Sequence, residues 1–242
     1  MQRCSALLLA AIITMLMASP AHAQLKFLKK LGLSGGQGST ALAEDDIRAG
    51  LKEALRVGID KTVALTGKKD GYNLNKKIHI PLPKNFKRVG SALSKVGFDK
   101  EVREFELSLN RAAEAAAPQA RDIFVETIGE MSMEDARRIL NGSDTAATDY
   151  LQKHATPELV EAFRPIVRKT MSKNDVMKRY NALIGKYNSP WMPKSLSPES
   201  VEKYTIEEAL QGLFLILGEQ EVLIRKDPAA RATDLLKKVF GQ

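Results

Sequence analysis

From residue 40 onward, apolar side chains recur mostly at helical spacing. A spacing near 3.6 residues places them on one face of a helix, which can then pack against other helices. The same period returns through most of the remaining sequence, so we predict a single all-α domain of about eight to ten helices. In the first stretch, which ends near Gly67, the periodic residues are Leu42, Ile47, Leu51, Ala54, Leu55, Ile59 and Val63.

One segment departs from this period. Residues 78–83 read Ile-His-Ile-Pro-Leu-Pro, so apolar residues alternate with other types. Alternation is typical of a strand, but proline lacks the N–H that a central strand needs. We therefore expect one short extended or strand-like segment near 78–82, at an edge or in a crossover.

Prolines and caps predict where helices begin and break. Pro118 is expected to kink or split a long helix, because proline removes a backbone hydrogen bond. Ser132 with Asp135 resembles a capping box, and the sequences Thr156-Pro157 and Thr205-x-x-Glu208 predict two further helix starts. The run Leu213–Leu217 is apolar all round, which predicts that its helix is central and fully buried.

The first 23 residues have the features of a secretory signal peptide. Arg3 precedes the apolar run 6–17, and Ala21-His22-Ala23 offers a small-x-small cleavage site. We expect cleavage after Ala23 and export to the periplasm, with no transmembrane segment in the mature chain. The expected layout is a signal peptide (1–23), a basic amphipathic piece with a Gly/Ser linker (24–39) and the helical domain (40–242).

Positive charge is concentrated in one window. Residues 68–100 carry a net charge of +7, against +8 for the whole chain. A local positive field attracts anions, which for an exported protein are lipid head groups or envelope polymers rather than nucleic acid. A solvated, lysine-rich loop is the alternative explanation. The candidate binding residues in this window are Lys68, Lys69, Lys76, Lys77, Lys84, Lys87 and Arg88.

The sequence offers few groups for catalysis or metal binding. The single cysteine, Cys4, would leave with the signal peptide, so the mature chain would form no disulfide or thiolate site. Only His79 and His154 would remain, without a metal-binding motif. We therefore predict no metal site, no cofactor and no catalytic residue.

Three polar clusters interrupt the apolar helices. Buried arginine–carboxylate pairs can determine which helices meet, and they can also line a pocket. We favour the structural role and keep the pocket as the alternative. The residues concerned are Asn110, Arg111 and Glu114 in the first cluster, Thr148 and Tyr150 in the second, and Glu221, Arg225 and Arg231 in the third.

Several of these segments give the chain a family resemblance. The sequence resembles an uncharacterised family of exported bacterial proteins, known only as a domain of unknown function, over residues 42–241. The resemblance implies a periplasmic, mostly helical domain and brings no activity, and the loop around Trp191 departs from the pattern. The segments that carry it are 50–55, 78–83, 110–114, 146–150, 212–214 and 224–236.

Three functional hypotheses follow. The first is a non-enzymatic periplasmic domain that binds an anionic envelope partner, a lipid head group or a polymer, through the basic window. The second is a carrier of an apolar or amphiphilic ligand between helices, with Arg111, Arg225 or Arg231 at the head group. The third is an enzyme of unknown class, for which no sequence signature is present.

Overall fold

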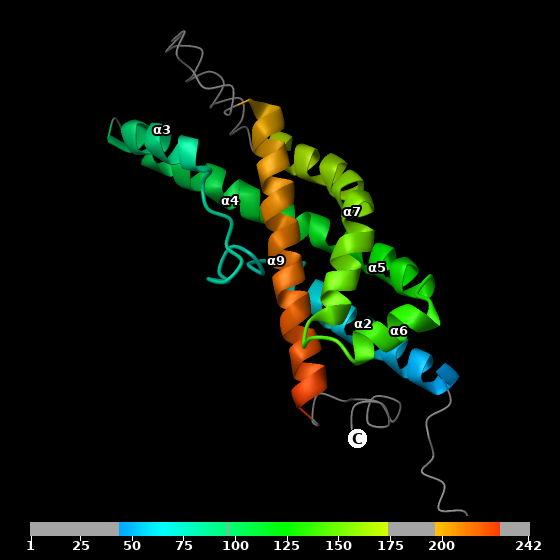
Figure 1. Ribbon diagram of the computed structural model, residues 1–242. Helices are drawn as coiled ribbons and strands as arrows, with labels where there is room; N and C mark the ends of the chain where they lie inside the picture. Colours follow the sequence, from blue (N-terminus) through cyan, green and yellow to red (C-terminus); the bar gives the residue numbers. More distant parts are fainter. Residues whose placement is uncertain (1–43, 96, 174–196, 228–242) are drawn as a thin grey trace, which may run out of the picture. The chain divides into compact units, whose positions relative to one another are not determined.

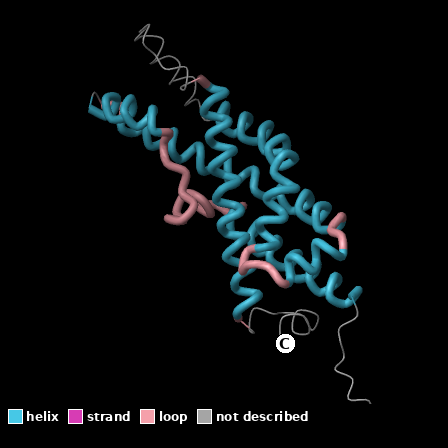
Figure 2. The backbone as a smooth tube through the Cα atoms, viewed as in Figure 1, coloured by secondary structure: helices cyan, strands magenta, loops and turns pink. Residues whose placement is uncertain are grey.

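The computed structural model describes residues 44–95, 97–173 and 197–227. The chain divides into Met1–Ala41, which lies outside the described residues, and Leu42–Gln242, to which everything below belongs. All regular structure in the described part is helical, with no strand there (Figures 1 and 2). The all-α class is therefore confirmed. The predicted helix count and the strand-like segment are not, and residues 79–83 have no regular secondary structure.

The last described helix, α9, and the long helix α7 form the centre of the packing. α9 lies against α2, α7 and α4, and α4 also packs along α7 (Figure 1). None of the described helices is both long and apolar enough to cross a bilayer. The elements in chain order are α2 (Glu44–Thr66), α3 (Lys84–Lys95), α4 (Asp99–Ala116), the 3₁₀ turn η1 (Ala117–Gln119), α5 (Ala120–Gly129), α6 (Met133–Leu140), α7 (Ala146–Lys173) and α9 (Pro198–Lys226).

Proline has different effects at different places in this fold. Pro118 ends α4 and lies in η1, so the predicted split is confirmed. The predicted helix start at Thr156-Pro157 is wrong, because α7 runs through both Pro157 and Pro165. Both prolines are exposed, so the carbonyls that lose a helical partner lie on the solvent side, where water can satisfy them.

Capping explains two other boundaries. The box at α6 is confirmed, since Ser132 Oγ accepts from Asp135 N at 3.1 Å and Asp135 Oδ2 accepts from Ser132 N at 3.2 Å. The predicted start at Thr205 is wrong. α9 already begins at Pro198 behind the N-cap Ser197, and Thr205 Oγ1 donates to the carbonyl of Val201 at 2.7 Å inside the helix.

An irregular loop, residues 67–83, packs part of its side chains against α4 and α9 and leaves its lysines exposed. The side chains of Tyr72 and Ile80 are fully buried, and Tyr72 Oη donates to the carbonyl of Ala209 in α9 at 2.6 Å. The close approach requires a residue without a side chain on α9. A Cβ atom at Gly212 would lie 2.8 Å from Tyr72 Cε1 and 3.0 Å from Ile78 Cβ.

Substitution by alanine should change the stability of the protein in opposite directions at two helical glycines. A Cβ at Gly58 in α2 would make ordinary contacts, 3.7 Å to Ile224 Cδ1, beside a small cavity of about 20 Å³. We expect Gly58→Ala to raise the free energy of unfolding by about 0.5–1 kcal/mol, through helix propensity and a less flexible unfolded chain. Gly212→Ala should lower it by about 1–3 kcal/mol, because the loop must move. Urea unfolding of both variants measures this, and shifts of the same sign would contradict it.

Candidate functional site

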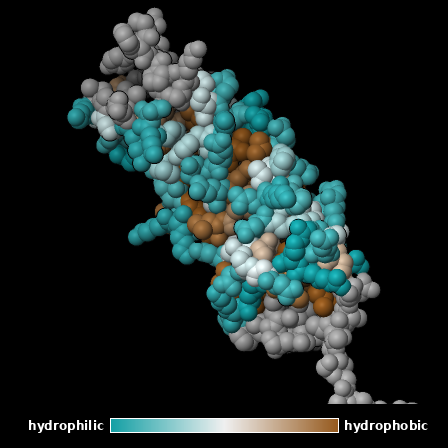
Figure 3. Space-filling model, viewed as in Figure 1, coloured by the Kyte–Doolittle hydropathy of each residue, from teal (hydrophilic) through white to brown (hydrophobic). Residues whose placement is uncertain are grey.

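A groove of about 1040 Å³ runs between α7 and α9. Its apolar lining comes from Val160 of α7 and from a stripe along α9, and threonines near the start of α7 line one end. Figure 3 shows apolar surface over the middle of α9 and beside α7, within an otherwise mostly hydrophilic face. The α9 stripe consists of Leu210, Phe214, Leu215, Val222 and Leu223.

Two leucines in this groove remain open to solvent. Leu215 is 46% exposed and Leu223 is 47% exposed. The prediction that Leu213–Leu217 is buried all round is therefore wrong at Leu215, while the other four residues are buried. α2, α4 and α7 cover the other sides of α9, and no described element covers this one. The sequence shows the apolar stripe on this helix. It does not show whether another helix covers the stripe or whether the stripe faces solvent.

The rim of the groove carries more negative than positive charge. Asp149, Glu207 and Glu219 line it together with a single basic residue, Lys77. Lys77 Nζ lies 2.6 Å from Glu219 Oε1, and both side chains are partly open to water. Since Lys77 also belongs to the basic window, the basic window and the groove meet at this ion pair.

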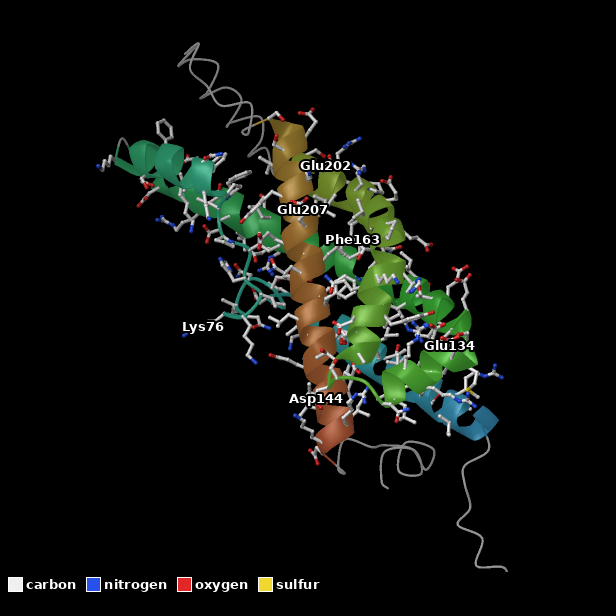
Figure 4. The ribbon with its side chains drawn as sticks, viewed as in Figure 1. Lys76, Glu134, Asp144, Phe163, Glu202 and Glu207 are labelled. Atoms are coloured by element: carbon white, nitrogen blue, oxygen red, sulfur yellow. The ribbon has the colours of Figure 1, made fainter. Side chains whose placement is uncertain are left out.

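The basic window is displayed on the surface. Lys68, Lys69 and Lys76 project from the loop, and Lys84 and Lys87 belong to α3; all five are exposed. Lys76 points away from α9 in Figure 4. The side chain of Arg88 lies outside the described residues. Among the described residues, no carboxylate pairs with these five lysines.

The first polar cluster fixes the loop that carries those lysines. Asn110 Oδ1 accepts from Ile80 N at 2.9 Å, and Asn110 Nδ2 donates to the Ile80 carbonyl at 2.8 Å. Glu114 Oε1 accepts from the backbone N–H groups of Tyr72 and Asn73, each at 3.1 Å. These side chains therefore satisfy backbone groups that a buried loop would otherwise leave unpaired.

Arg111 completes this cluster with two ion pairs. It donates to Glu114 Oε2 at 2.6 Å and to Asp70 Oδ1 at 2.7 Å. Hydrogen bonds from Asn73 and Arg111 lower the pKa of Asp70, and burial raises the pKa of the Tyr72 phenol. Arg111 is thus held within the fold, and it does not line the groove.

His79 adds a further tie between the loop and α4. Its Nδ1 lies 2.9 Å from the carbonyl of Asn73, and its Nε2 lies 2.9 Å from Glu106 Oε1. Both partners are acceptors when Glu106 is ionised, so both hydrogen bonds form together only when the imidazole carries two protons.

The third cluster joins two helix ends. Glu221 of α9 accepts from the N–H groups of Ala147 and Thr148 at 3.0 and 2.8 Å, which places its negative charge at the N-terminus of α7. Arg225 pairs with Glu221 at 2.9 Å and donates to the carbonyls of Ile139 and Leu140 at the C-terminus of α6. One ion pair therefore caps both helices from a third.

The remaining predicted residues have other surroundings. Thr148 belongs to the Glu221 network through Thr148 Oγ1, at 2.8 Å. Tyr150 lies against His154, with the two rings tilted and their centroids 4.5 Å apart, in a separate pocket of about 350 Å³ between α6 and α7. Burial raises the pKa of Tyr150. Arg231 lies outside the described residues. Within the described part of the chain, no three His, Asp or Glu side chains form a group that could hold a metal ion.

Replacing Asn110 should loosen the loop. Asn110→Leu keeps a similar volume but leaves the buried N–H and carbonyl of Ile80 without their partner, so the free energy of unfolding should fall by about 2–4 kcal/mol. Amide exchange at Ile80 should also become faster. The control is Asn141→Leu, because Asn141 is exposed and bonds only within its own helix end. Equal effects in the two variants would contradict the anchoring role.

Comparison with protein families places the chain. No curated protein and no solved structure matches the chain. A family model described as "Protein of unknown function (DUF4197)" matches residues 41–241, which is most of the sequence. The chain therefore belongs to the DUF4197 family.

Proposed function

We propose that the domain is a non-enzymatic binding protein that holds an apolar or amphiphilic ligand in the groove between α7 and α9. The observation that carries this proposal is the pair of exposed leucines, Leu215 and Leu223, in an apolar groove of about 1040 Å³. Ligand sites in proteins are typically concave and mainly apolar, with a few polar groups at the edge. Exposed apolar side chains that are scattered over a surface are ordinary, whereas a group of them in one groove indicates a binding site.

The polar end of the ligand is expected at the carboxylates of the rim. The arginines that the sequence suggested for a head group, Arg111 and Arg225, are held by hydrogen bonds inside the fold. Asp149, Glu207 and Glu219 outnumber Lys77 at the groove. A neutral or cationic head group is therefore favoured over an anionic one at this site.

Substitution of the two leucines tests the groove. Leu215→Lys together with Leu223→Lys should weaken binding of the neutral fluorophore N-phenyl-1-naphthylamine about tenfold or more, since burying a leucine contributes about 1.5–3 kcal/mol. Unfolding should change little, because both positions are exposed. Leu65→Lys is the matched control, at a leucine that is 41% exposed and outside the groove. Binding that is equal in the variant and the control would refute the proposal.

A second candidate function is contact with an anionic envelope partner through the basic window. The observation that favours it is the fixed backbone of the loop, which Asn110 and Glu114 hold from α4. A lysine-rich loop that serves only solubility needs no such anchoring. Lysines on a fixed backbone lose less entropy when they bind a surface together.

Charge reversal tests whether the basic window itself binds the anionic partner, or whether the net positive charge of the protein is enough. We expect wild type to float with phosphatidylglycerol vesicles at low salt and not with phosphatidylcholine vesicles. Lys68→Glu, Lys76→Glu and Lys84→Glu together should abolish that flotation. The control reverses three exposed lysines outside the window, Lys61, Lys153 and Lys169. The control variant changes the net charge by the same amount. If flotation is lost equally in both variants, the basic window has no specific role and net charge alone explains the binding.

Both candidates assume a protein of the cell envelope. That assumption depends on the predicted signal peptide in residues 1–23, which lie outside the described residues. Export to the periplasm stays a prediction from the sequence.

A further inference from the structure

The loop 67–83 carries the most exposed large apolar side chain in the described part of the chain. Leu74 is 74% exposed, whereas the other exposed leucines of that part have 38–47% of their surface open to solvent. A single exposed leucine is ordinary on a protein surface. Two further features, a fixed backbone and the neighbouring charges, set Leu74 apart from a leucine of that kind.

Hydrogen bonds fix the backbone at Leu74. The N–H of Leu74 donates to the carbonyl of Asp70 at 3.2 Å. The N–H of the preceding residue, Asn73, donates to Glu114 Oε1 at 3.1 Å, and Asn73 Nδ2 donates to Asp70 Oδ1 at 2.9 Å. The turn that carries Leu74 is therefore tied both to itself and to α4.

The core has no place for Leu74, because other side chains of the same loop fill it. Tyr72, Ile78 and Ile80 point inward and are only 0–5% exposed. Tyr72 is also bonded through its hydroxyl to the carbonyl of Ala209 in α9. The apolar surface of Leu74 can therefore leave water only by contact with a partner outside this part of the fold.

Three lysines share the loop with Leu74. Lys68, Lys69 and Lys76 are exposed, and none of them pairs with a carboxylate of the described residues. The one acidic residue of the loop, Asp70, is held in an ion pair within the fold. A leucine among available ammonium groups matches the surface of an anionic bilayer, where acyl chains lie beneath negatively charged head groups.

Other partners match this surface less well. An anionic polymer is held by charge alone and has no apolar layer that would take up a leucine. Protein interfaces are depleted in lysine, and their centres are apolar patches made by many residues. A bilayer surface takes up both kinds of side chain at once.

We propose that the loop 67–83 binds an anionic lipid bilayer, with Leu74 inserted at the boundary between head groups and acyl chains. Lys68, Lys69 and Lys76 then contact the lipid phosphates. The inference rests on the second candidate function, because it concerns the same basic window. It goes further by naming the lipid surface as the partner and Leu74 as the inserted residue.

A tryptophan reporter tests the insertion. The chain has a single tryptophan, Trp191, so Leu74→Trp in a Trp191→Phe background provides one fluorophore in the full chain. With phosphatidylglycerol vesicles at low salt its emission should shift to the blue, and brominated acyl chains should quench it. Because the reporter is local, contacts of other segments with the bilayer do not produce this signal.

The matched control is Leu223→Trp in the same background, at a leucine of α9 that is 47% exposed. Its emission should change with neither vesicles nor brominated lipid. A blue shift in this control without one at position 74 would place the lipid contact at the groove and overturn the proposal.

Flotation of further full-length variants separates this inference from the candidate function on which it rests. Leu74→Ser should weaken binding to phosphatidylglycerol vesicles roughly fivefold, because the inserted apolar surface is lost. Unfolding should not change, since the side chain is already exposed. Reversal of Lys68, Lys76 and Lys84 to glutamate should remove both flotation and the blue shift.

The remaining outcomes are distinct. Lysine-dependent flotation that is the same in Leu74→Ser, with no blue shift at position 74, refutes the inserted leucine and keeps the basic window as a binding site. Binding to dextran sulfate without flotation also refutes the inserted leucine and makes the partner a polymer. Wild type that binds neither vesicles nor dextran sulfate refutes the second candidate function as well.

Discussion

The need to satisfy the polar backbone of a buried loop constrains much of this domain. Residues 67–83 have little regular structure, yet Tyr72 and Ile80 are fully buried between α4 and α9. Asn110 and Glu114 supply the hydrogen bonds that a helix or sheet would otherwise provide. The position of α4, the missing side chain at Gly212 and the display of the lysines all follow from that arrangement.

The same device occurs near the C-terminal end of α9. There the backbone groups belong to helix ends, and Glu221 and Arg225 satisfy them from a helix far along the chain. α9 thus caps the end of α6 and the start of α7, in addition to packing along α2, α4 and α7. The groove lies on the same helix, beside Thr148, which this network holds in place.

Local patterns predicted the parts of the fold that depend on local physics. Helical periodicity gave the all-α class, and Pro118 and the Ser132–Asp135 box marked true boundaries. The pairs Arg111–Glu114 and Glu221–Arg225 could be predicted from their i,i+3 and i,i+4 spacing. Their distant partners could not, because Asp70 and Ile139 meet them only through tertiary packing. The same limit applies to Pro157, whose effect depends on which side of α7 faces water, and to Leu215.

The hydrogen bond between Tyr72 and Ala209 has a consequence for the order of folding, since it joins residues 137 apart in sequence. Contacts of such long range form late, because much of the chain must be in place before the loop that connects them can close. During synthesis, α2 and α4 emerge well before α9, so the buried loop has no cover until nearly the whole chain is available. A chain that seals its core with its last described helix therefore stays incompletely packed for most of its synthesis.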